Sequence, residues 1–121
     1  MNVLWPVVDL HRGNNQLLGI MTIAAVLEKH GHRSDVVDAS PRAAADMLRK
    51  RRYDILAFST MSVHCRTFLR LNRALKKEFS ILSIFGGPHP TYSPGMIEQE
   101  GVDAVCVGEG EFAMLDLVRN L

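Results

Sequence analysis

Few cysteines occur in this sequence, and it also lacks the features of several protein classes. Its 121 residues include two cysteines, Cys65 and Cys106, too few for a disulfide framework and too far apart for a zinc-binding CxxC pair. No apolar run approaches the roughly 20 residues that a membrane-spanning helix needs. The first ten residues, MNVLWPVVDL, have neither the basic start nor the small-residue cleavage site of a signal peptide. We therefore expect a cytoplasmic protein without membrane contacts.

The chain also lacks an excess of either charge. Its formal net charge is +1, which gives no electrostatic reason to expect nucleic-acid binding. The basic run at residues 49–52 is short enough to be a solvated helix end. With 47% hydrophobic residues, the composition is that of a soluble globular protein, and the length predicts a single domain spanning residues 1–121.

What the sequence does have is a regular alternation of strand and helix patterns. We predict strands at residues 3–8, 33–37, 54–59, 81–85 and 102–107. We predict helices at residues 17–30, 41–50, 64–79, 94–100 and 111–121. Ser40 and Pro41 are a typical helix start, Gly31 is a typical helix stop, and Phe68, Leu71, Ala74 and Leu75 form the predicted buried stripe of the third helix.

Five βα units predict an α/β fold with a five-stranded parallel sheet and helices on both faces. Right-handed crossovers favour the strand order 2-1-3-4-5, a flavodoxin-like (Rossmann-like) three-layer sandwich. In such sheets, ligands bind beyond the carboxyl ends of the strands, near the point where the strand order reverses. The loops that follow the strands are therefore the places to look for function.

These loops are rich in glycine, serine, threonine and histidine, and poor in paired carboxylates and candidate catalytic triads. Hydroxyl groups after the third strand can either contact a ligand or cap the next helix. Consecutive glycines after the fourth strand allow a ligand to approach the backbone, and the Pro-His-Pro segment behind them predicts a rigid loop. The predicted ligand-binding residues are Ser59, Thr60, Ser62, Gly86, Gly87, Pro88, His89, Gly108 and Glu109.

The loop after the first strand holds a candidate metal ligand. Asp9 and His11 can form a pair in which the carboxylate orients the imidazole, so that the other ring nitrogen is available to a metal. His11 is the only residue for which we predict metal ligation, and solvation of this histidine in a polar loop is the alternative.

Two of these loops resemble a known family. The sequences FGGPHPTYSP (residues 85–94) and GVDAVCVGEGE (residues 101–111) resemble the N-terminal cobalamin-binding domain of class B radical S-adenosylmethionine enzymes. LLGIMTIAAVLEKHGHRSDVVDA (residues 17–39) and FSTMS (residues 58–62) are similar to other parts of the same domain, so the likeness covers essentially the whole chain.

The resemblance implies cobalamin bound at the carboxyl edge of the sheet. Related cobalamin domains have the motifs D-x-H-x-x-G, S-x-L and G-G, and the last two lie near the nucleotide tail of the cofactor. Ser59-Thr60-Met61 stands in for the second motif, and Gly86-Gly87 matches the third. His11 would be the axial cobalt ligand, but the first motif has one residue between His11 and Gly13 where the pattern has two.

The resemblance also implies a partner. Radical S-adenosylmethionine chemistry requires a CxxxCxxC motif for an iron–sulfur cluster, which Cys65 and Cys106 cannot provide. We therefore expect no catalysis by this chain alone. It would hold cobalamin for a radical S-adenosylmethionine catalytic domain of the methyltransferase or cyclase type.

Three alternatives compete with this interpretation. A response-regulator receiver needs a phosphoacceptor aspartate at the end of the third strand, where this chain has Ser59. A flavodoxin needs a hydroxyl-rich phosphate loop after the first strand, and residues 9–16 contain no serine or threonine. The third alternative is a domain that keeps the fold, binds no cofactor and docks on a radical domain to shape its substrate site.

Overall fold

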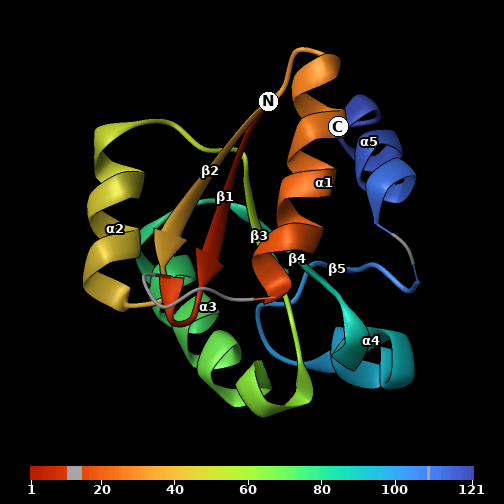
Figure 1. The fold of residues 1–121 in the computed structure, drawn as a ribbon. Helices are drawn as coiled ribbons and strands as arrows, with labels where there is room; N and C mark the ends of the chain where they lie inside the picture. Colours follow the sequence, from red (N-terminus) through yellow and green to blue (C-terminus); the bar gives the residue numbers. More distant parts are fainter. Residues whose placement is uncertain (11–14, 109) are drawn as a thin grey trace.

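Five parallel strands form a single sheet in the order β2-β1-β3-β4-β5 (Figure 1). The computed structural model describes residues 1–10, 15–108 and 110–121. The strands are β1 (Asn2–Val7), β2 (Arg33–Asp38), β3 (Ile55–Ser59), β4 (Leu82–Gly86) and β5 (Ala104–Val105). The predicted flavodoxin-like fold and its strand order are thus confirmed, and the order reverses between β1 and β3.

Helices cover both faces of the sheet. They are α1 (Asn15–Lys29), α2 (Pro41–Lys50), α3 (Cys65–Glu78), α4 (Pro88–Tyr92) and α5 (Glu111–Arg119), with 3₁₀ turns η2 (Ser62–His64) and η3 (Pro94–Glu98). In Figure 1, α1 and α5 lie on one face and α2 and α3 on the other. Within the described parts of the chain, no helix has the length and apolar character to cross a membrane.

The central strand β3 divides the hydrophobic core into two layers. Leu56 and Phe58 face α2 and α3, where the Phe58 ring stacks on Phe85 at 4.5 Å between ring centroids. Ile55 and Ala57 face α1 and α5. All four side chains are at most 1% exposed, as expected for a strand that is covered on both faces. Ala57 is the smallest of them, and it faces the α1 and α5 side.

The start of α2 and the end of α1 are formed by the residues that the sequence predicted for them. The Ser40 hydroxyl accepts a hydrogen bond from Ala43 N at 3.1 Å, and Pro41 takes the first position of α2. Gly31 has a φ of +86°, and His32 N donates to Leu27 O at 2.9 Å, which closes the end of α1.

The structure differs from the prediction in four places. Residues 94–98 form the 3₁₀ turn η3 instead of the predicted helix at residues 94–100. The Pro-His-Pro segment is not a loop: Gly87 turns the chain with a φ of +95°, and Pro88 then begins the short helix α4. Strand β5 has two residues instead of the predicted six. In α3, Ala74 is exposed, while Asn72 is fully buried and donates from Nδ2 to Gly101 O at 2.8 Å.

Candidate functional site

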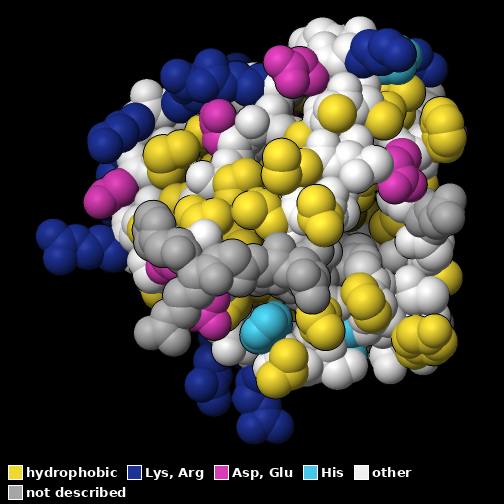
Figure 2. All heavy atoms as spheres, viewed as in Figure 1, with side chains coloured by type: hydrophobic (Ala, Val, Ile, Leu, Met, Phe, Trp, Pro, Cys, Tyr) yellow, Lys and Arg dark blue, Asp and Glu magenta, His cyan; other side chains and the backbone are white. Residues whose placement is uncertain are grey.

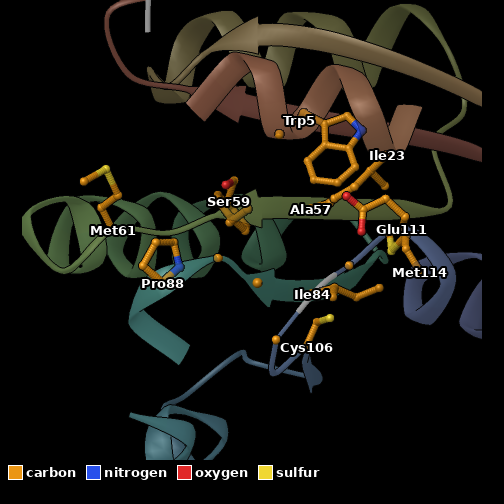
Figure 3. A pocket seen from close by; sticks show the side chains of 16 residues that line it. Trp5, Ile23, Ala57, Ser59, Met61, Ile84, Pro88, Cys106, Glu111 and Met114 are labelled. Carbon is orange, nitrogen blue, oxygen red and sulfur yellow. The ribbon is translucent and has the colours of Figure 1, made fainter. Parts of the chain in front are cut away.

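A cavity of about 390 Å³ lies at the carboxyl edge of the sheet, on the side covered by α1 and α5. Trp5, Ala57 and Ile84 line it from three adjacent strands (Figure 3). Its other walls are formed by Gly19, Ile23, Phe58, Ser59, Met61, Gly86, Gly87, Pro88, Cys106, Gly108, Gly110, Glu111 and Met114. Its volume is in the range of small-molecule and cofactor pockets, and it lies beside the reversal of strand order, where ligands of this fold bind.

Glycines keep the mouth of the cavity open, although for different reasons. A Cβ on Gly86 would meet only Cys106, at 3.5 Å from its Cβ, and one on Gly108 would meet nothing within 4 Å. A Cβ on Gly87 would lie 2.9 Å from Thr60 N, closer than real side chains approach. Gly87 is therefore required by the protein's own packing, whereas Gly86 and Gly108 leave bare backbone that a ligand can contact.

The structure brings five of the predicted ligand-binding residues to the cavity wall. These are Ser59, Gly86, Gly87, Pro88 and Gly108. The prediction for each of them rested on its place after a strand, and the parallel sheet brings these strand ends to one edge. Glu109 and the candidate metal ligand His11 lie outside the described residues.

Three other predicted residues, Thr60, Ser62 and His89, do not line the cavity. Thr60 is fully buried, its N donates to Gly86 O at 2.7 Å, and its carbonyl accepts from His89 N at 2.9 Å. Ser62 Oγ and His89 Nδ1 form a hydrogen bond of 3.0 Å. Thr60, Ser62 and His89 thus join the loop after β3 to the start of α4. The Thr60 hydroxyl is also buried, and it finds no hydrogen-bond partner among the described residues.

The apolar wall of the cavity was not predicted. Trp5 is 3% exposed, and in Figure 3 its six-membered ring is directed toward the other labelled side chains. Ile23 and Met114 approach from α1 and α5. The alternation of Val3, Trp5 and Val7 places these side chains on one face of β1, which is the available sequence signal for Trp5.

Few polar side chains line this cavity. Burial raises the pKa of the Cys106 thiol, and the nearby Glu111 carboxylate raises it further. The Ser59 hydroxyl and the Glu111 carboxylate complete the polar lining. Among the described residues, no group of three or more His, Cys, Asp and Glu side chains is arranged to hold a metal ion. The described walls therefore suit a largely apolar organic group.

Comparison with known families shows which family the chain belongs to. The family model for the B12 binding domain matches residues 6–118, nearly the whole chain. The chain belongs to the B12-binding domain family. Cobalamin is accordingly its cofactor. No curated protein matches the sequence.

The cavity fits the cofactor of a B12-binding domain. It opens at the carboxyl edge of the sheet, where Gly86 and Gly108 expose backbone without side chains. Its apolar interior between the sheet, α1 and α5 can take the nucleotide tail of a corrinoid. The match to the B12-binding domain also decides against the receiver and flavodoxin alternatives.

Proposed function

We propose that this B12-binding domain holds cobalamin for a radical S-adenosylmethionine catalytic domain of the methyltransferase or cyclase type. The cavity at the carboxyl edge supports cofactor binding, and it is the observation on which the proposal chiefly rests. The loops FGGPHPTYSP and GVDAVCVGEGE support the radical enzyme, because they resemble the cobalamin-binding domain of that family, and both border the cavity through Gly86 and Gly108.

The surface around the cavity mouth supports a partner that covers this edge. Val63, Tyr92, Val107 and Phe112 are 56–86% exposed, and each follows a different strand or begins α5 at the carboxyl edge. Large apolar side chains gathered at one edge are typical of surfaces that contact another protein. In Figure 2, viewed as in Figure 1, the strands run downward toward their carboxyl edge, and hydrophobic side chains are exposed at the lower right, around α4.

In this proposal the domain positions the cofactor and does no chemistry of its own. Bound cobalamin supplies the cobalt ion, and the protein determines its orientation toward the catalytic domain. Ser59 would hold polar groups of the nucleotide tail, while Trp5, Ile23 and Met114 would exclude water from its base. Gly86 and Gly108 would lie against the cofactor, because they present backbone alone.

A direct test is gel filtration of the purified chain with hydroxocobalamin. We expect the visible absorption of the corrin ring to co-elute with the protein. Elution of all the cobalamin at small-molecule volume would contradict the proposal and favour the domain that docks without a cofactor.

The radical partner is tested separately, by translating the coding sequence on both sides of this segment. A CxxxCxxC motif is expected there or in an adjacent gene.

Alkylation of the two cysteines locates the bound cofactor. Cys106 lines the cavity, whereas Cys65 begins α3 and is not part of the cavity wall. Burial raises the pKa of both thiols, so both should react more slowly with iodoacetamide near pH 8 than a free thiol does. The rates should rise as the pH is raised above the ordinary range for thiols, because only the thiolate reacts.

Methylcobalamin should slow the reaction of Cys106 further and leave Cys65 unchanged, as measured by mass spectrometry of the alkylated peptides. Cys65 serves as the control within the same molecule. Equal protection of both cysteines, or of neither, would place the cofactor elsewhere.

A further inference from the structure

The cavity mouth is bounded by two loops that have little means of fixing each other. Gly87 follows β4 and Gly108 follows β5, and both have positive φ angles, +95° and +86°. Beyond the ladder between β4 and β5, Cys106 N donates to Phe85 O at 2.8 Å. Neither glycine has a side chain, so a side-chain bridge between the two loops must come from a third group. Strand β5 has only two residues, and its ladder to β4 pairs Phe85 with Val105 but does not extend to Gly108.

Thr91 is that third group. From α4, its hydroxyl donates to Gly87 O at 2.9 Å and accepts a hydrogen bond from Gly108 N at 3.0 Å. A single oxygen thus joins the loop after β4 to the loop after β5. The side of α4 toward β3 is fixed by other contacts, since His89 N donates to Thr60 O at 2.9 Å. The short helix therefore links three successive strand ends.

We propose that Thr91 is a positioning residue, whose hydroxyl holds Gly87 and Gly108 at the spacing that admits the cofactor. The proposal rests on the proposed function, namely that cobalamin occupies this cavity. Thr91 does not itself line the cavity, so it acts through the two glycines. A mouth that already has its bound spacing loses less conformational freedom when the ligand enters, and this raises affinity.

Two variants of Thr91 separate the effect of its hydroxyl group from the effect of its side-chain shape. Thr91→Val keeps the branched shape and removes both hydrogen bonds, while Thr91→Ser keeps the hydroxyl. Thr22→Val is a matched control, because the Thr22 hydroxyl also donates to a carbonyl four residues earlier, Leu18 O at 2.9 Å, but within the described residues it accepts no bond from a second loop.

Two measurements are made on each variant of the whole chain. The dissociation constant for methylcobalamin is obtained from the change in visible absorption. The exchange rate of the Gly108 amide proton is measured by NMR in the absence of cofactor, and the thermal midpoint is recorded alongside.

We expect Thr91→Val to bind methylcobalamin about tenfold more weakly, as the loss of two modest hydrogen bonds predicts. Its Gly108 amide should exchange several times faster, and Thr91→Ser should restore both values to within about threefold of the original protein. Thr22→Val should match the original protein in both measurements.

Unchanged affinity and amide exchange in Thr91→Val would overturn the inference while leaving the proposed function intact. A Thr91→Ser variant that binds as weakly as Thr91→Val would also overturn it, since the hydroxyl would then not be the active group. If the unaltered chain binds no methylcobalamin, the proposed function fails, and the role of Thr91 in cofactor affinity fails with it. Accelerated Gly108 exchange in Thr91→Val would then show only a structural contact.

Discussion

Gly87→Ala is expected to destabilise the domain by about 2 to 4 kcal/mol and to abolish cobalamin binding. The new Cβ would lie 2.9 Å from Thr60 N and 3.1 Å from Thr60 O, and these backbone atoms are fixed by their own hydrogen bonds to Gly86 and His89. The φ of +95° adds strain for any residue with a side chain. The loop after β3 and the start of α4 must therefore separate. Urea unfolding gives the loss of stability, and absorption titration gives the loss of binding.

Gly108→Ala is the matched control for this variant. Its φ of +86° is similar, but a Cβ there would have nothing within 4 Å. We expect it to cost about 1 kcal/mol of stability, from the backbone conformation alone. If Gly87→Ala were no less stable than Gly108→Ala, the close packing of Gly87 on Thr60 would not matter to the fold.

Gly86→Val is expected to leave the fold nearly intact and to weaken cobalamin binding by at least about 100-fold. Gly86 ends β4, its φ is not positive, and its Cβ would make an ordinary 3.5 Å contact with the Cys106 side chain. Valine suits a strand, so the free energy of unfolding should change by less than about 1 kcal/mol. Its two methyl groups would fill part of the space that Gly86 leaves open at the cavity mouth.

The smaller Gly86→Ala variant should show the same effect in weaker form, and thermal unfolding would show whether either variant remains folded. Normal cobalamin affinity in a stable Gly86→Val protein would mean that the cofactor does not approach this backbone. Neighbouring glycines thus have separable roles, one in the packing of the protein and the other in the space for its ligand.

Much of the fold follows from local sequence patterns. The alternation of apolar strands with amphipathic helices predicts all five strands and their order, because parallel strands need crossovers of one hand. The errors occur where tertiary contacts override local preference. Asn72 is buried because it bonds to Gly101 O and accepts from the Ser83 hydroxyl, two partners that are distant in sequence. Strand β5 is short although its sequence is apolar over a longer stretch.

The residues of the candidate site were likewise predictable only in part. Its glycine edge was predictable, because the ends of parallel strands meet at one edge of the sheet. The apolar walls were not, since Trp5, Ile23 and Met114 belong to three elements that only packing brings together. Ser62, His89 and Thr60 were predicted to face a ligand, but hydroxyl and imidazole groups in a loop can equally bind the neighbouring loop. The role of Thr91 could not be predicted from the sequence, because its partner Gly108 lies 17 residues away.

Trp5 is the single tryptophan of the chain, and it stands in the wall of the cavity. The ultraviolet emission of the protein therefore arises beside the cavity in which we propose that the cofactor binds. Corrins absorb light in the range where indole emits, so loading should dim this signal without any attached dye. Mixing experiments on the unmodified chain can thus follow cofactor entry and release in real time, and a tyrosine in place of Trp5 would supply the dark reference.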